Sequence, residues 1–426
     1  MDKLKKRLSY LQKTRSVQKQ WDSLAGEETL STRSKLEKLV STRLKNKPIA
    51  PGKKSSPPPS GGNEPYFSKE YLYPVTLDFN GVRLGDYPAA APEEIRLLFP
   101  SPLAPDLDPR RVVFFDTETT GLAGGTGTIP FMLGFGYFED EFFKVKTYIL
   151  GNPAREAEFL EEVDRFLQEK GFSYTVTYNG RGFDFPLMET RYLLQRKRFP
   201  LLTLPHLDLL FISRMVWKHT YESRKLGYLG DILLGISREE DVLGYQIPGL
   251  YFEFLREGRL EAMDRICEHN SMDLVGLLGL LILVLGFLRD EARVKDPGEA
   301  LGIARLLELR GRVKRAEAYY RRVVREDARP DLTRRALLHL SLIKKRSRCF
   351  SEAKGLWERL LDFEKPFFAY RELAMVYEHR ERNLQRALDL VTRALETGSL
   401  NDFYRQDFIR RKERLLNKIR NRQCRE

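Results

Sequence analysis

The chain has 426 residues, of which 42% are hydrophobic and 31% are charged, and it carries a net charge of +13. This length allows two or three domains, and this composition is that of a soluble, mostly globular protein. The three cysteines, Cys267, Cys349 and Cys424, lie far apart, which excludes paired metal-ligand spacing and a disulfide framework and fits a reducing cytosol.

The positive charge is concentrated at the two ends of the chain. Residues 1–60 contain 15 Lys and Arg against 5 Asp and Glu, and residues 401–426 contain 9 against 4. Basic ends of this kind suit a polyanion such as nucleic acid, although they could also serve only to keep the protein soluble. No apolar core follows the basic N-terminus, so no signal peptide is expected.

The longest apolar run, Leu274 to Leu288, has 15 residues with three glycines inside. Because roughly 18–20 apolar residues are needed to cross a bilayer, this run predicts a buried helix. We therefore expect a cytoplasmic protein without membrane contact.

Residues 1–65 form the first expected part of the chain. Residues 1–46 have amphipathic helical spacing with basic residues between, typical of a segment that docks on a partner or stays a loose arm. Residues 47–65 are rich in Pro, Gly and Ser and predict a linker with no packed element. Residues 66–108, rich in Pro and aromatic residues, predict irregular structure against the domain that follows.

The most informative stretch is residues 111–122, where the apolar run Val112 to Phe115 precedes Asp-Thr-Glu-Thr-Thr-Gly. The run predicts a buried strand. Side chains two apart on a strand point the same way, so Asp116 and Glu118 should project together at its C-terminal end. Two carboxylates in one small volume repel unless protonated or neutralised by a cation. This pattern predicts a divalent metal site; two acids on a solvated strand end are the alternative.

The next segments predict a mixed sheet. Residues 131–137 and 142–150 read as further strands of a β-meander, and residues 154–170 have the spacing of an amphipathic helix. Residues 174–178 predict another strand. Together these elements indicate an α/β fold with a mixed sheet flanked by helices.

The second informative site contains Asp184, which follows that strand and precedes a predicted helix that continues through residues 187–194. It is a candidate metal ligand, and because Pro186 follows it, a helix N-cap is the alternative. For His206 and Asp208 we expect a capping or solvated role, and support of the metal ligands from behind is the alternative.

Further along, residues 226–234 predict a short helix, and residues 238–244 and 247–249 predict loops. A third site, residues 268–273, stands at the front of the long apolar helix. His269 and Asp273 are four residues apart and share one helix face. An aspartate in a buried helix is costly unless it is paired or metal-bound. A structural role is the alternative for His269.

Four carboxylates and one histidine thus occur at the ends of core elements of one α/β unit. Oxygen ligands of this type suit two Mg²⁺ or Mn²⁺ ions, which could activate water against a phosphodiester. A nearby histidine could accept the proton of that water. The candidate catalytic residues are Asp116, Glu118, Asp184, His269 and Asp273, and the four acids among them are the candidate metal ligands.

The motifs Asp-Thr-Glu-Thr-Thr-Gly-Leu, Asn-x-x-x-Phe-Asp and His-Asn-x-x-Asp resemble those of the DEDD superfamily of metal-dependent 3′→5′ exonucleases. Over about residues 108–290 the chain is similar to the YprB-type ribonuclease H-like exonuclease domain, through residues 178–187, 206–210 and 269–273. The resemblance implies a ribonuclease H-like fold, metal binding by the four acids and proton transfer by the histidine. It also implies a role in DNA repair and, in some members, partnership with a superfamily 2 helicase.

One feature departs from the superfamily pattern. Its histidine subclass usually has the histidine five residues before the last aspartate, and its tyrosine subclass has a tyrosine four before. Here His269 stands four residues before Asp273. The general-base assignment is therefore open, whereas the metal site is not affected.

Residues 298–398 predict helical repeats. Ala316, Ala353 and Ala387 recur at intervals of 37 and 34 residues. The apolar residues four positions later are Tyr320, Trp357 and Val391. This spacing is tetratricopeptide-like and is typical of a surface that binds a protein partner; a structural cap on the nuclease domain is the alternative. Residues 401–426 predict a basic helix that caps the repeats or contacts phosphates.

We therefore expect four parts: a basic arm and linker (1–65), a ribonuclease H-like domain with its lead-in (66–290), tetratricopeptide-like repeats (298–400) and a basic helix (401–426). The expected activity is 3′→5′ exonucleolytic hydrolysis of DNA that depends on two metal ions. Two alternatives remain, an RNA-processing exonuclease and a non-catalytic scaffold that binds nucleic acid or protein.

Overall fold

The computed structural model describes residues 52–54, 64–121, 127–237, 242–327, 329–364, 366–397 and 400–423. The chain separates into two units, residues 1–48 and 49–426, and the whole first unit lies outside the described ranges. The predicted amphipathic segment 1–46, residues 238–241 and Cys424 thus lie outside the described residues. The predicted division into four parts stays a prediction.

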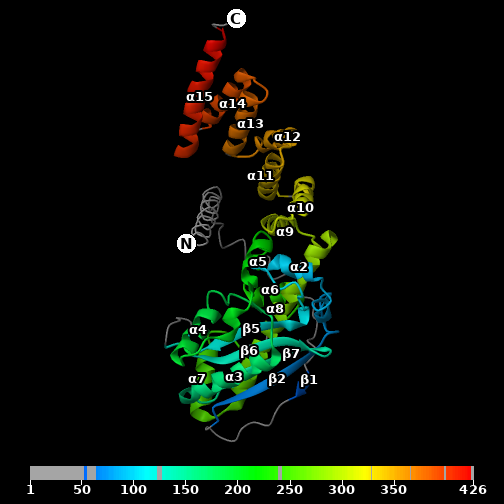
Figure 1. Cartoon of the computed structure of the whole chain (residues 1–426), viewed down its shortest axis with the longest axis vertical. Coiled ribbons are helices and arrows are strands. Elements are labelled where there is room, and N and C mark those ends of the chain that lie inside the picture. The colour runs from blue at the N-terminus through cyan, green and yellow to red at the C-terminus, as the bar shows by residue number, and fades with distance from the viewer. Residues whose placement is uncertain are drawn as a thin grey trace, which may run out of the picture. The chain divides into compact units, whose positions relative to one another are not determined.

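Seven strands of the described chain form one mixed sheet in the order β1-β2-β7-β6-β5-β8-β9 (Figure 1). The strands are β1 (Gly52–Lys54), β2 (Tyr66–Pro74), β5 (Val112–Thr119), β6 (Pro130–Glu139), β7 (Phe142–Leu150), β8 (Tyr174–Thr177) and β9 (His206–Asp208). Neighbours from β1 through β5 pair antiparallel, whereas β8 pairs parallel with β5 and β9 with β8. The predicted α/β sheet, with its meander and later strand, is confirmed.

Two expectations for the N-terminal side of this sheet are wrong. Gly52–Lys54 and Tyr66–Pro74 are strands, and β2 pairs with β7 along its full length. Tyr71 and Tyr73 of β2 are 5% and 3% exposed, so aromatic residues two apart fill the core as in any half-buried strand. The prolines suggested irregular structure, yet α2 (Pro92–Leu98) begins with one, at a position where no helical N–H partner is lost. A small hairpin of β3 (Asp78–Phe79) and β4 (Val82–Arg83) lies between β2 and α2 along the chain.

Different helices cover the two faces of the sheet. On one face, Phe166 of α3 (Glu156–Lys170) packs against Phe135 and Tyr137 of β6. The intervening positions of β6 point to the other face, which α8 (Leu260–Arg289) covers. β5 therefore lies in the middle of a three-layer arrangement, with one face toward α8.

The long helix α8 is the central helix of the α/β part. By length and composition alone it could cross a membrane, but 83% of its most apolar window is buried inside the protein, as in the core helix of a soluble protein. The predicted buried helix at residues 274–288 is thereby confirmed. The helix begins nine residues before the His-Asn-x-x-Asp motif, so the expectation that this motif opens the helix is wrong. Met263 and Ile266, three residues apart and fully buried, already belong to its core-facing side.

Four short helices complete this part. They are α4 (Asp184–Leu194), α5 (Leu209–Val216), α6 (Leu226–Leu234) and α7 (Ile247–Glu257). α6 confirms the predicted helix. The loop expected at residues 247–249 is wrong, because these residues form the first turn of α7. Pro248 and Gly249 are tolerated there, since first-turn N–H groups have no helical partner.

Residues 297–423 fold into helices α9 (Pro297–Leu309), α10 (Val313–Glu326), α11 (Pro330–Arg346), α12 (Phe350–Leu360), α13 (Phe367–His379), α14 (Leu384–Glu396) and α15 (Asp402–Gln423). Neighbouring helices pack as the pairs α9–α10, α11–α12 and α13–α14. Ala316, Ala353 and Ala387 lie on the second helix of each pair and are 0% exposed. The helix pairs are confirmed, whereas their likeness to tetratricopeptide repeats stays a prediction.

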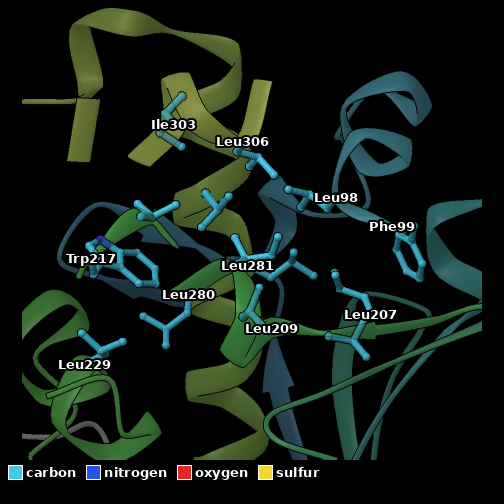
Figure 2. Packing of buried hydrophobic residues seen from close by; sticks show 14 of the residues in the cluster. Leu98, Phe99, Leu207, Leu209, Trp217, Leu229, Leu280, Leu281, Ile303 and Leu306 are labelled. Carbon is cyan, nitrogen blue, oxygen red and sulfur yellow. The ribbon is translucent and has the colours of Figure 1, made fainter. Parts of the chain in front are cut away.

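The first helix of this series continues the core of the α/β part. Trp217 at the end of α5 and Leu280 of α8 belong to the same apolar cluster as Ile303 and Leu306 of α9 (Figure 2). The indole Nε1 of Trp217 also donates a hydrogen bond to Glu299 Oε1 at 3.1 Å. Burial of these apolar side chains joins α9 to the sheet-bearing part.

Candidate active site

The two acids of the first motif lie inside β5 rather than beyond its end, because the strand continues to Thr119. Asp116 pairs with Gly134 of β6, and Glu118 pairs with Met132. Gly134 faces α8, so Asp116 and Glu118 project to the face of the sheet that α8 covers. The sequence predicted that the two acids share a direction, and the strand geometry agrees.

From α8, one turn of helix approaches this strand. The His269 Nε2 atom lies 3.6 Å from Asp273 Oδ2 and 3.8 Å from Glu118 Oε1. The imidazole is therefore between a carboxylate of its own helix and one of the sheet. Both distances exceed that of a hydrogen bond.

Asn270, the next residue of α8, was not singled out from the sequence. Its Nδ2 atom donates a hydrogen bond to Asp116 Oδ2 at 2.9 Å, and its side chain is fully buried. A Cβ atom on Gly134 would come within 1.9 Å of Asn270 Oδ1, so only glycine leaves room for this amide. A glycine inside an otherwise apolar strand was the available signal, since it marks a close approach.

Asp184 is the first residue of α4 and is 4% exposed. The N-cap position belongs to Phe183, without a side-chain hydrogen bond, so the N-cap alternative for Asp184 is wrong. The Thr117 hydroxyl instead donates to Asp184 Oδ1 at 2.5 Å. This bond ties the start of α4 to β5, between Asp116 and Glu118.

Asp208 supports the site from the end of β9. Its Oδ1 atom accepts hydrogen bonds from the Leu210 N–H at 3.1 Å and the Asn179 N–H at 2.8 Å. The first of these bonds caps α5, which confirms the capping role predicted for Asp208. His206 Nε2 lies 2.8 Å from Thr177 Oγ1 and so links β9 to β8. Both residues hold the frame that leads into α4.

Comparison with known proteins gives two matches in sequence. A family model described as RNase_H superfamily matches residues 113–284. The chain is also 33% identical over 291 residues to the uncharacterized protein YprB of Bacillus subtilis (strain 168), covering 67% of this chain and 69% of that protein. This chain belongs to the YprB family of the ribonuclease H superfamily. The predicted resemblance is confirmed, and all five candidate catalytic residues fall within residues 113–284.

The YprB-family chain also has a partial match among solved structures. It is similar to the family B DNA polymerase from the hyperthermophilic archaeon Pyrobaculum calidifontis, with a TM-score of 0.32 and 14% identity over 47% of this chain. The match spans only 29% of the polymerase chain. A TM-score of this size does not by itself relate two folds.

Negative charge is concentrated at the site of this YprB-family domain. Burial, followed by the carboxylates of Asp184, Asp273 and Glu118, raises the pKa of Asp116 well above its usual range. The hydrogen bond from Asn270 acts in the opposite direction. Each of the strongest charged influences on Asp116 is thus another carboxylate.

The same holds in milder form for Asp184. Burial raises the pKa of Asp184 to about 6, and the charge of Asp208 adds to this effect, whereas the hydrogen bond from Thr117 lowers it. Buried acids with strongly raised pKa values are typical of functional sites, because the fold gains no stability from them.

Members of the ribonuclease H superfamily usually use divalent metals, so the donor set was tested for that chemistry. Within the described ranges, no group of three or more His, Cys, Asp or Glu side chains is already arranged to hold a metal ion. The donor chemistry nevertheless fits. Carboxylate oxygens are the ligands that Mg²⁺ and Mn²⁺ prefer. A dication would reduce the repulsion between Asp116 and the neighbouring carboxylates.

Proposed function

We propose that this chain is a metal-dependent 3′→5′ exonuclease that hydrolyses phosphodiester bonds of DNA. The ribonuclease H superfamily already implies a nuclease domain that acts on nucleic acid. The observation that carries the finer proposal is the meeting of carboxylates from separate segments of the chain. Asp116 and Glu118 share one face of β5, the Thr117 hydroxyl holds Asp184 to that strand, and His269 Nε2 lies near both Glu118 and Asp273. Burial and these carboxylates also raise the pKa of Asp116. A cluster of this kind is expensive unless cations enter it.

Each residue has a distinct proposed role. Asp116, Glu118, Asp184 and Asp273 would hold two Mg²⁺ or Mn²⁺ ions, which when bound supply an activated water and neutralise the charge of the phosphate. His269 is the proposed general base. Water forms a bond to phosphorus and gives a proton to His269 Nε2, the bond between phosphorus and the 3′-oxygen breaks, and that oxygen takes up a proton.

The position of His269 supports this role. Its Nε2 atom lies near both Asp273 Oδ2 and Glu118 Oε1, so an imidazolium formed there is stabilised by two carboxylates. Because the ring is on α8 and Glu118 is on β5, the fold rather than chain proximity brings the base to the acids.

The wider biological proposals rest on the resemblance to the family and on charge. We propose action in DNA repair in the cytoplasm, with the helices of residues 298–400 recruiting a protein partner such as a superfamily 2 helicase. The basic residues at both ends of the chain support contact with a nucleic-acid backbone. No sugar preference follows from backbone-directed chemistry, so RNA belongs in the test.

The deciding experiment uses 3′-labelled and 5′-labelled DNA strands and matched RNA strands, with Mg²⁺, with Mn²⁺ and with chelator. Metal-dependent release of the 3′ label, with a ladder from the 5′-labelled strand, is the expected result. If only the RNA strands are cleaved, the substrate is RNA and the DNA assignment is wrong. No cleavage of any strand with either metal would leave the chain as a scaffold.

The role of His269 has its own test. His269→Ala should slow cleavage by about 10²–10⁴-fold, because the attacking water loses its proton acceptor. His379→Ala is the matched control, since this half-exposed histidine lies in the helical part. Single-turnover rates over a pH series measure both. An unchanged rate for His269→Ala would make that residue structural.

A further inference from the structure

Among the described residues, a cavity of about 410 Å³ lies at the turn that follows β8. It is lined by Tyr178, Asn179, Leu210, Arg214, Arg224, Lys225 and Leu226. Three of these residues are cations and none is an acid. The cavity therefore has the opposite charge to the carboxylate cluster, and the proposed chemistry does not use it.

The topology places this cavity at the same edge of the sheet as the acids. β5, β8 and β9 run parallel, so their carboxyl ends meet at one edge, where open α/β sheets bind ligands. Asp116 and Glu118 lie near that end of β5, Tyr178 and Asn179 follow β8, and Leu210 follows β9.

Asp208 connects the cavity wall to the turn that leads into Asp184. Its two carboxylate oxygens accept hydrogen bonds from the N–H groups of Asn179, Arg181 and Leu210. Asn179 and Leu210 line the cavity, and Asp184 begins α4 five residues after Asn179. One buried carboxylate thus holds the cavity and the acid-bearing turn in a common frame.

The segment that carries two of the cations is held in place by neutral groups. The Tyr178 hydroxyl donates a hydrogen bond to the Arg224 carbonyl oxygen. Arg224 Nη1 donates to the carbonyl oxygens of Tyr221 at 3.0 Å and Glu222 at 2.9 Å. These contacts shape the segment without neutralising it, and a guanidinium has further N–H donors on Nε and Nη2.

Arg214 and Lys225 complete the positive wall, and both side chains are exposed to solvent. Lys225 precedes α6, whose first turn has no side-chain cap, so the positive end of that helix adds to the same field. Tyr178, Leu210 and Leu226 supply an aromatic and apolar surface between the cations. A ligand that fits this wall carries negative charge next to a flat or apolar group.

We propose that this cavity binds a phosphodiester group of the substrate strand, on the 5′ side of the bond that is cleaved, with the adjoining nucleotide against Tyr178 and the two leucines. The inference rests on the proposed function for its substrate. A volume of about 410 Å³ exceeds the need of a lone phosphate and falls in the usual range for small-molecule sites, roughly 300–1,000 Å³. Contacts to a phosphate and one stacking surface imply a single strand read without base specificity.

The first test measures binding without cleavage. The full chain is titrated into a fluorescein-labelled 12-nucleotide DNA strand in chelator, by anisotropy at several salt concentrations. The Arg214→Ala/Lys225→Ala variant should bind about tenfold more weakly or worse, because it loses charged hydrogen bonds to phosphate. Its salt dependence should also fall, by about 0.7 in slope for each lost phosphate contact.

A matched control removes the same charge elsewhere. The Arg155→Ala/Arg165→Ala variant removes a cation at the N-cap of α3, which pairs with Glu158, and one within α3, which pairs with Glu162. It should bind DNA like the wild type. Arg214→Lys/Lys225→Arg keeps the charge and should retain most of the affinity. Equal weakening by both alanine pairs, or none by the Arg214/Lys225 pair, would overturn the proposal.

A second test uses strand length with metal present. The cavity variant should lose kcat/KM on the 12-nucleotide strand but match the wild type on a dinucleotide, whose single phosphodiester is the one cleaved and which therefore has none for the cavity. An equal loss on both lengths overturns the assignment of this site to the 5′ side. If no strand is cleaved but the cavity variant still loses DNA affinity in chelator, the proposed exonuclease fails and the binding site stands.

Discussion

Two regions of this molecule bury carboxylates, and they treat them in opposite ways. In the α/β part, burial and other acids raise the pKa of Asp116 well above its usual range. In the helical part, the carboxylate of Glu378 is fully buried and faces cations of α15. Burial alone would raise the pKa of Glu378, but hydrogen bonds from Arg414 and Lys418 outweigh it and hold the pKa at about 2.

The contacts at Glu378 are complete enough to define a structural role. Glu378 Oε2 accepts hydrogen bonds from Arg411 Nη1 at 3.1 Å and Arg414 Nη2 at 2.6 Å. Glu378 Oε1 accepts from Arg414 Nε at 3.0 Å and Lys418 Nζ at 2.8 Å. These cations all belong to α15, so the basic C-terminal helix is anchored to α13 through one acid. Part of the positive charge seen in the sequence therefore serves the fold.

A second acid of the helical part repeats this arrangement. Glu308 lies 3.0 Å from His339 Nδ1 and accepts further hydrogen bonds from Arg346 and Tyr320. Burial raises the pKa of Glu308, yet the interactions with His339, the hydrogen bond from Arg346 and the charge of Arg305 lower it to below its usual range. A buried acid that the protein itself neutralises supports structure, whereas a buried acid surrounded by acids is a site for something from outside.

The largest expected effect comes from removing one acid of the cluster. Asp116→Asn should lower metal-dependent cleavage by about 10³-fold or more, since a lost metal ligand removes several kcal/mol of transition-state stabilisation. In chelator the same variant should melt at a higher temperature than the wild type, because mutual repulsion of the carboxylates falls. Cleavage assays and thermal unfolding measure the two effects. A lower melting temperature in chelator would break the comparison.

The opposite result is expected at Glu378. Glu378→Gln should leave the cleavage rate unchanged and destabilise the protein by about 2–4 kcal/mol, because the buried Arg411 loses its charged partner. Arg414 and Lys418, which are half exposed, lose a partner that water can partly replace. Glu381→Gln is the matched control: this acid pairs with Lys354 at a more exposed position, and the expected change is below about 1 kcal/mol.

The pH dependence of that loss follows from the lowered pKa of Glu378. Because its folded pKa of about 2 lies below the unfolded value of about 4.3, its contribution is fully present above the unfolded value. The contribution is lost as the pH falls from about 5 toward 2. Urea unfolding of the wild type and Glu378→Gln should therefore converge across that range. A constant difference at every pH would show that packing, not charge, makes the contribution.

The smallest of these effects concerns Asn270. Asn270→Ala should weaken metal binding by about 10–100-fold, the usual cost of losing a group that orients a metal ligand, here Asp116. Isothermal titration calorimetry with Mn²⁺ measures this metal affinity directly. Ser271→Ala is the matched control, because this neighbouring residue bonds the Tyr73 hydroxyl at 2.6 Å instead of an acid. Equal metal affinity in both variants would remove Asn270 from the site.

Much of the α/β core could be predicted because the signals are local. The apolar run before Asp116, the two strands of the meander and the apolar half of α8 each have a hydrophobic pattern that predicts the element from nearby residues alone. The motif order around Asp184 and Asp273 also indicated the family, which the comparison with YprB confirmed. The roles of the five candidate residues stay predictions.

The errors occurred where one residue type has two meanings. Proline and glycine suggested irregular structure at residues 66–108 and a loop at residues 247–249, but proline also suits the first turn of a helix. The aromatic alternation of β2 was present in the sequence and was outweighed by composition. The start of α8 was misplaced because its first eight residues carry more polar side chains than the rest.

The sequence by itself determined strands β5 to β8, the carboxylates of the candidate site and the basic ends of the chain, because each depends on residues close together along the chain. Only the tertiary structure decided which acids meet cations and which meet other acids. It set Asn270 against Gly134, and it set the cationic cavity beside Asp208. Such pairings join residues far apart in the chain, and electrostatic energy depends on distance in space rather than on distance in sequence.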